Sequence, residues 1–289
     1  MIKLIEHIRY KKITENSEYS FFINSTFINE DVSFIQTNRI ENLTLSQYEG
    51  YEFLHIIPII NIKCLKKIEI FVKKIDLQGL DKLSSLEELS IGEEYQNLEL
   101  NNLSNLRVLY LVNGSFTGLQ SLKKLKELTL VNSNGLALSK NNFIENSSIE
   151  SLTIYNAKGQ IDFTFLLKLK NLKKLDLYNV KSKIDLRLFN SFAESLEELK
   201  IEKCKEIEYL EYALVKFNTL KYLSLIDSVT IASAENISHL NSIEIIVVLG
   251  TSYFVNGEIS RLRNLQHVSI DDKKHYSLKN YQLPKLPYD

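Results

Sequence analysis

LKKLDLYNV (172–180) returns 24 residues later as LEELKIEKC (196–204), and LKYLSLIDS (220–228) follows after another 24 residues. The three stretches begin with the same phrase: an apolar residue, two variable ones, an apolar residue, a variable one and a further apolar residue. The second half of the phrase alternates apolar and variable positions, which is the period of two that a half-buried strand requires. Each copy of the phrase therefore predicts one short β-strand.

Further copies extend this pattern along most of the chain, at spacings of 19 to 25 residues. The eleven copies start at Ile40, Leu65, Leu86, Leu106, Leu125, Ile149, Leu172, Leu196, Leu220, Ile243 and Leu265. One strand cannot bury its apolar face alone, but parallel strands stacked about 4.8 Å apart place these apolar residues in continuous columns. We therefore expect a stack of parallel strands with a core that runs along the stack.

The phrase resembles the L-x-x-L-x-L signature of the leucine-rich repeat family, over about residues 40–270. The resemblance implies an α/β fold: a curved solenoid of about eleven repeats, with a parallel sheet on its concave face and short helices or irregular returns on its convex face. The repeat from Leu196 resembles the cysteine-containing subtype of the family.

One position departs from the family pattern. Family-typical repeats carry Asn or Cys three residues after the phrase, where the side chain bonds to backbone inside the turn. In this chain that place holds Gly114, Ser133, Ala157, Val180, Cys204 and Ser228. Asn113, Asn132, Asn156, Asn179 and Asp227 stand one residue earlier.

The two ends of the chain lie outside the phrase. We expect residues 1–39 to form an N-terminal cap, with one or two extra strands in the stretch 19–38. Residues 40–275 are expected to form the repeats, and residues 276–289 a C-terminal cap or tail. Between strands, the segments 163–170, 186–195 and 211–218 are long enough for a helical turn or two. The short repeats from Leu86 and Leu106 have room only for extended or 3₁₀ chain.

Composition narrows the classes of function. With 44% hydrophobic residues, 25% charged residues and a net charge of -1, the chain has no general attraction for nucleic acid or anionic membranes. The first 20 residues lack the apolar core of a signal peptide, and no run approaches about 18 apolar residues, so we expect a cytoplasmic protein. Cys64 and Cys204 are too few for a disulfide framework and are expected to be buried, reduced thiols.

The concave face offers the candidate binding residues. The third and fifth positions of each phrase, and the residue after it, point away from the core. The candidates for partner binding are Phe71, Val108, Tyr110, Val112, Val131, Tyr155, Tyr178, Tyr222, Ile226, Ile245, Val247 and Leu249. They predict one patch around Val108 to Tyr178 and a second from Tyr222 to Leu249. The alternatives are cross-strand packing between repeats, a C-terminal tail that covers the second patch, and self-association through the C-terminal repeats.

Charged residues occupy the second position of most phrases. They are Glu41, Lys66, Glu87, Arg107, Lys126, Glu150, Lys173, Glu197, Lys221 and Glu244. Apart from Arg107 beside Lys126, the sign alternates at every step, so each charge faces an opposite charge on the next strand. This ladder predicts a structural role that holds the repeats in register.

Catalytic and cofactor motifs are not apparent in the sequence. His267, Ser269 and Asp271 share one strand face, but alternate side chains along a strand stand about 7 Å apart, too far for the direct hydrogen bonds of a catalytic triad. The nine glycines form no phosphate-binding motif. We therefore expect no catalytic, cofactor or metal site.

The sequence thus predicts a non-enzymatic protein–protein interaction module that binds a protein partner on its concave face. A cytosolic inhibitor or immunity-type protein is the specific version that fits, by analogy with the family. The alternatives are a structural scaffold or self-associating repeat protein, and a secreted internalin-like surface binder.

Overall fold

The computed structural model describes residues 10–12, 19–133, 138, 142–143, 148–237 and 240–285 of the 289. The chain divides into two compact units, Met1–Ala137 and Leu138–Asp289.

The first unit is built on a sheet whose strands follow one another in chain order. Among its described residues these are β1 (Tyr10–Lys12), β2 (Tyr19–Phe22), β3 (Asn42–Ser46), β4 (Lys67–Phe71), β6 (Glu88–Ile91), β9 (Val108–Val112) and β11 (Glu127–Val131). The β1 strand pairs with β2 in antiparallel fashion, and every later pair is parallel.

The second unit repeats this plan with parallel pairs throughout its described strands. These are β12 (Ser151–Tyr155), β13 (Lys174–Tyr178), β15 (Glu198–Glu202), β17 (Tyr222–Ile226), β18 (Ile245–Leu249) and β19 (His267–Ile270). Equivalent residues lie opposite one another, so that Leu175 pairs with Leu199 and Leu199 with Leu223. All three leucines are at most 1% exposed, which confirms the predicted core column.

Each of the eleven copies of the phrase contains one of these strands, and β2 adds a parallel strand outside the phrase. The predicted α/β stack of parallel strands is confirmed. The number of repeats and the boundaries of the caps stay predictions, and the parts of the caps at 1–9, 13–18 and 286–289 lie outside the described residues.

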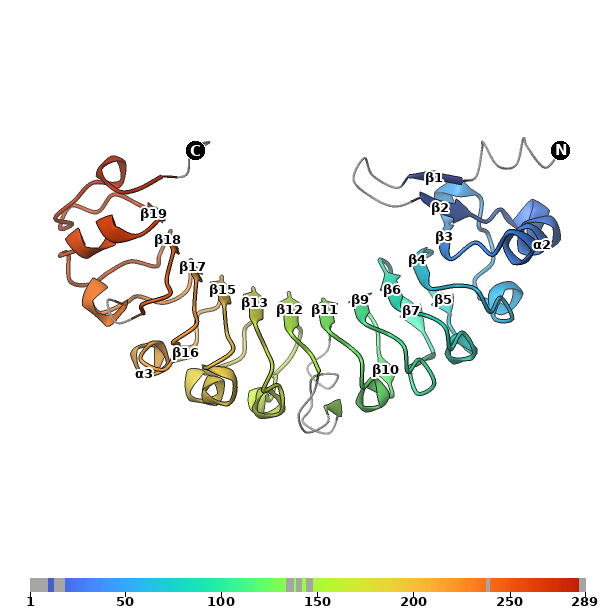
Figure 1. Ribbon diagram of the computed structural model, residues 1–289, viewed down its shortest axis with the longest axis horizontal. Helices are drawn as coiled ribbons and strands as arrows, with labels where there is room; N and C mark the ends of the chain where they lie inside the picture. Colours follow the sequence, from blue (N-terminus) through green and yellow to red (C-terminus); the bar gives the residue numbers. More distant parts are fainter. Residues whose placement is uncertain are drawn as a thin grey trace. The chain divides into compact units, whose positions relative to one another are not determined.

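The returns of each unit lie on one side of its sheet (Figure 1). In the first unit they hold η2 (Gln47–Glu49), η3 (Ile57–Ile59), β5 (Ile75–Asp76), η4 (Leu80–Lys82), β7 (Tyr95–Gln96), β8 (Leu98–Glu99), β10 (Phe116–Thr117) and η5 (Leu119–Ser121). As predicted, the short repeat from Leu86 contains extended chain (β7 and β8), and the one from Leu106 contains extended and 3₁₀ chain (β10 and η5). Small parallel ladders pair β5 with β7 and β8 with β10.

In the second unit the longer returns contain helical turns. They hold η8 (Phe163–Lys168), β14 (Ile184–Asp185), η9 (Leu186–Phe192), β16 (Ile207–Glu208), α3 (Leu210–Leu214), η10 (Ala234–Ile237), η11 (Ser260–Asn264) and η12 (Asn280–Gln282). The three segments predicted to be helical correspond to η8, η9 and α3. Asp162 and Asp185 begin the first two of these by accepting the backbone N–H of the residue two positions on.

The N-terminal cap contains a helix that the sequence did not predict. After β2, the chain forms η1 (Ser25–Phe27) and α2 (Ile28–Asn38). Asp31 and Ile35, four residues apart, are both fully buried, and the Asp31 carboxylate accepts the backbone N–H of Asn24 at 2.9 Å. The predicted extra strands are therefore right for β2, whereas the later part of the segment follows a helical period.

The C-terminal segment up to Lys285 lies along the outer edge of β19. The Val268 backbone N–H donates to the Pro284 carbonyl at 3.0 Å, and Lys285 Nζ donates to the Val268 carbonyl at 2.6 Å. An open strand edge offers unpaired backbone groups to other chains, and these contacts shield part of that edge, as a cap would.

A row of left-handed residues ends the strands and accounts for the displaced asparagines. Asn113, Asn132, Asn156, Asn179 and Asp227 have φ between 47° and 53°. Asn and Asp enter this region more readily than other residues that carry a Cβ. The residue that follows turns into the core, and Ala157, Val180 and Cys204 are at most 5% exposed there. Lys203, before Cys204, has the same conformation with φ of 54°, so the turn requires a left-handed residue, most often Asn, one position before the family-typical place.

Candidate functional site

The face of each sheet opposite the returns, called the open face below, carries the first, third and fifth residues of the strands. All twelve predicted binding residues lie on it. Phe71 and Tyr110 are each 37% exposed, and the other ten are partly exposed. The predicted orientation is therefore confirmed, whereas their role in binding a partner stays a prediction. In the predicted patch from Val108 to Tyr178, Tyr155 and Tyr178 belong to the second unit and the other members to the first.

In the first unit, the open face is centred on β9. Val108, Tyr110 and Val112 all point outward from this strand, and Val112 lies opposite Val131 on β11. Phe71 extends from β4 across the next repeat. A Cβ on Gly92 would come within 2.8 Å of the Phe71 ring, so glycine leaves the space that the ring occupies.

In the second unit, Tyr155 and Tyr178 form a ring pair on β12 and β13. Their centroids are 5.3 Å apart, and the Tyr155 hydroxyl donates to the Asp176 carboxylate at 3.2 Å. Burial raises the pKa of Asp176, and burial followed by the nearby Asp176 charge raises the pKa of Tyr155. A half-buried carboxylate and two tyrosines thus form one connected group.

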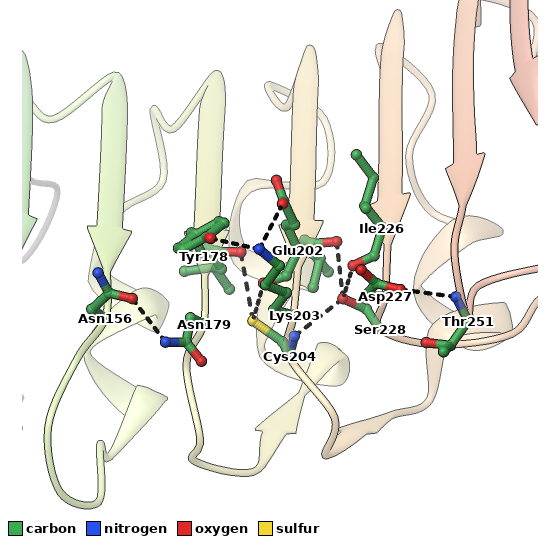
Figure 2. A network of polar contacts seen from close by, with 12 residues as sticks. Asn156, Tyr178, Asn179, Glu202, Lys203, Cys204, Ile226, Asp227, Ser228 and Thr251 are labelled. Carbon is green, nitrogen blue, oxygen red and sulfur yellow. Dashed lines mark hydrogen bonds and ion pairs between the residues drawn. The ribbon is translucent and has the colours of Figure 1, made fainter.

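Lys203 completes this group from the turn after β15 (Figure 2). Its Nζ donates to the Tyr178 hydroxyl at 2.7 Å, lies 4.9 Å from the Tyr178 ring centroid, and is 3.8 Å from the Glu202 carboxylate. Neither Asp176 nor Lys203 was among the predicted binding residues. Asp176 could have been found by the same alternation, but the reach of Lys203 depends on its left-handed φ of 54°.

The turns beside these tyrosines are joined from repeat to repeat (Figure 2). Asn179 Nδ2 donates to Asn156 Oδ1 at 2.8 Å, and the Thr251 backbone N–H donates to Asp227 Oδ1 at 3.0 Å. Between them, the Cys204 backbone N–H donates to Ser228 Oγ at 3.2 Å. Each turn is therefore tied to the next, which fixes the edge of the open face.

The two cysteines differ in their surroundings. Cys204 is fully buried, and burial raises its pKa to about 11, so the thiol stays protonated at neutral pH, as expected of a structural cysteine. Cys64 is only partly buried, so the expectation of burial was wrong for it. Its thiol lies 3.3 Å from the Ile40 carbonyl, beside the start of the repeats.

The second predicted patch lies on β17 and β18. Tyr222 faces Ile245 and Ile226 faces Leu249 across the two strands, while Val247 faces the buried Ser224. Lys200 Nζ lies 5.1 Å from the Tyr222 ring centroid. The C-terminal segment, as far as Lys285, follows the edge of β19 and leaves this patch partly exposed.

Ion pairs join neighbouring members of the charge ladder in the part of the chain that the structure describes. The distances are 2.7 Å for Lys66–Glu41, 3.8 Å for Arg107–Glu87, 2.8 Å for Lys173–Glu150 and 2.8 Å for Lys221–Glu197. All of these pairs are well exposed to solvent and join neighbouring repeats. The contacts support the structural role that the alternation of sign predicts.

We expect the Lys173→Glu variant to melt at a lower temperature than the wild type in low salt, because it sets a third carboxylate between Glu150 and Glu197. Salt screens such exposed charges, so the difference should shrink in about 0.5 M NaCl. Thermal melts at both salt concentrations measure it. Lys170→Glu, on the return before β13, is the matched control. An equal loss in both variants, or a loss that salt does not change, would argue against the ladder.

The described residues do not meet the requirements of a catalytic triad, a metal site or a membrane-spanning helix. His267 is 8% exposed and alternates with Ser269 along β19, the spacing that argues against a triad. Within the described ranges, no group of three or more His, Cys, Asp or Glu is arranged to hold a metal ion. None of the helices in that part of the chain has the length and apolar character needed to span a bilayer.

Comparison with known proteins finds solved structures with a similar fold. No family model and no curated protein sequence matches the chain. TLR13, solved as a TLR13–ssRNA13 complex, superposes with a TM-score of 0.62 at 16% identity, over 89% of this chain and 40% of TLR13. An internalin, InlF from Listeria monocytogenes, gives 0.58 at 14% identity, over 99% of this chain and 88% of the internalin.

PEPR1, in a PEPR1–AtPEP1 structure, gives a TM-score of 0.51 at 16% identity over 89% of this chain. The chain spans 44% of PEPR1 and, as above, 40% of TLR13, so it corresponds to less than half of either protein. Identities this low show a shared fold and nothing about shared partners.

Proposed function

This chain has the leucine-rich repeat fold, and we propose that it is a non-enzymatic module that binds a protein partner on its open face. The observation that carries the proposal is the exposure of tyrosine and aliphatic side chains on neighbouring strands, at positions where the fold itself needs no apolar residue. Tyrosine-bearing patches of this kind are typical of interface cores. The net charge of -1 favours a protein over nucleic acid or an anionic membrane.

Affinity purification from the source cell tests this proposal. We expect Tyr155→Ser, Tyr178→Ser to recover at least about tenfold less of the partner than the wild type, because it removes the central ring pair. Val215→Asp is the matched control, since Val215 is 57% exposed on the return side. Circular dichroism checks that both variants fold. Equal recovery of the same partner by all three proteins would refute a role for this ring pair.

The narrower form of the proposal is a cytosolic inhibitor or immunity-type protein that covers the active surface of a toxin or enzyme. The unpaired Cys64 and Cys204 support a reducing compartment. The alternative is a secreted internalin-like surface binder. Cell fractionation separates the two, because recovery of the protein in the culture medium would contradict the cytosolic form.

Self-association is a second candidate function, favoured by the apolar pairing of Tyr222, Ile226, Ile245, Val247 and Leu249 on two adjacent strands. An isologous contact between two copies would cover both patches at once. Light scattering at tens of micromolar decides the matter, since a monomeric mass at that concentration would exclude a stable dimer.

A further inference from the structure

The open face of the first unit has an apolar strand between two polar ones. Glu88 on β6, Val108 on β9 and Glu127 on β11 lie at one level of the sheet. Ser90, Tyr110 and Thr129 lie at the next level. Since neighbouring strands are about 4.8 Å apart, the two glutamates stand on either side of Val108 with about 10 Å between their strands.

Negative charge on this face exceeds what the chain itself neutralises. The charged residues of the open face on β4, β6, β9 and β11 are Lys67, Glu69, Glu88 and Glu127, so one positive and three negative charges give -2. Lys67 Nζ lies 3.4 Å from the Glu69 carboxylate and 3.6 Å from the Glu88 carboxylate, so one lysine is shared by two carboxylates. The Glu127 side chain makes no ion pair or hydrogen bond with the described residues.

Tyr110, like Glu127, lacks the contacts that the tyrosines of the second unit make within the chain. There, Lys203 lies against the Tyr178 ring, Lys200 lies against the Tyr222 ring, and the Tyr155 hydroxyl is bonded to Asp176. Tyr110 is 37% exposed, and among the described residues no cation lies over its ring and no group bonds its hydroxyl. The second unit thus shows, within this chain, the contact that Tyr110 lacks: an ammonium group against the ring, with a carboxylate nearby.

We infer that the open face of the first unit receives an arginine side chain of the protein partner, stacked on Tyr110 and held between Glu88 and Glu127. The inference rests on the proposed function and names the chemistry of the partner. A guanidinium stacks on an aromatic ring, is weakly hydrated, and can donate to carboxylates on two sides. Its aliphatic stem packs along Val108. The unbalanced charge of this face repels an acidic partner and attracts a basic one.

Two short peptides test the inference without knowledge of the partner: acetyl-Gly-Arg-Gly-amide and the same peptide with citrulline, which keeps the shape and removes the charge. The full chain, with ¹³C-labelled tyrosine rings, is titrated with each peptide by NMR. We expect the arginine peptide to shift the Tyr110 ring signals in a saturable way, and the citrulline peptide to bind at least about fivefold more weakly.

Variants show whether the carboxylates supply the attraction. Glu88→Gln, Glu127→Gln should weaken the arginine peptide about five- to tenfold, whereas Glu99→Gln, on β8 among the returns, should leave its affinity unchanged. Equal binding of the two peptides, or no shift of Tyr110 with either one, overturns the inference. A Tyr110 shift that depends on protein concentration alone overturns it too, because a second copy then occupies the face. Loss of the partner in Tyr155→Ser, Tyr178→Ser would still support the proposed function in those cases.

Discussion

Replacing Leu199 by alanine is expected to lower the free energy of unfolding by about 2–5 kcal/mol. Leu199 is fully buried on β15 and lies between Leu175 and Leu223 in the core column. The change removes buried apolar volume and leaves a cavity, because the neighbouring strands are fixed by their ladders and cannot close the gap. Urea denaturation followed by circular dichroism measures the loss.

The control for this variant is the next residue along the same strand. Lys200 points to the open face and is partly exposed, so Lys200→Ala is expected to change the stability by less than about 1 kcal/mol. A comparable loss in both variants would show that the strand register of β15 is wrong, since the two side chains must lie on opposite faces.

Replacing Gly257 by alanine is expected to cost about 3 kcal/mol and to loosen the C-terminal cap. A Cβ at this position would overlap the backbone carbonyl of His275, which lies well inside van der Waals contact. Backbone cannot rotate away as a flexible side chain can, so the segment around His275 must shift. That shift breaks the hydrogen bond from the Ser277 N–H to the Gly257 carbonyl, at 2.8 Å, and the packing of Tyr276.

Hydrogen exchange locates this effect. We expect faster exchange in the segment 272–285 and little change in the strands of the first unit. Gly79→Ala is the comparison, because Gly79 has φ of 87° while a Cβ there meets only ordinary contacts. Its cost comes from the backbone conformation alone and should stay near 1 kcal/mol. A smaller loss for Gly257→Ala than for Gly79→Ala would contradict the proposed clash.

Much of the fold was predictable because the repeated phrase has the residue pattern of a strand that is buried on one face. Alternation with a period of two determines which side chain of each strand faces the core, and this holds from Leu43 on β3 to Val268 on β19. The twelve binding candidates followed from the same rule, since the residue opposite a buried one must point outward. The alternating charges between Glu41 and Lys221 likewise predicted contacts that the structure contains.

Other features depend on contacts between distant residues, which no local sequence pattern predicts. The helix α2 is held by the buried Asp31, the edge of β19 by Pro284, and the left-handed turns set Asn one position early. The sequence predicted two patches of binding residues and did not distinguish between their tyrosines. In the structure, Tyr178 and Tyr222 lie against the chain's own lysines, and Tyr110 does not.

The sequence by itself thus determined the strands, their register and the face on which each side chain lies, because these follow from the two-residue period of a strand and the need to bury leucine. The tertiary structure alone decided which exposed groups already have partners. Lys203 and Tyr178 are 25 residues apart in the chain and meet only when two repeats stack and a turn adopts a left-handed conformation. Electrostatic pairing depends on the distance between two groups in space, and repeats that share one sequence pattern differ in these distances.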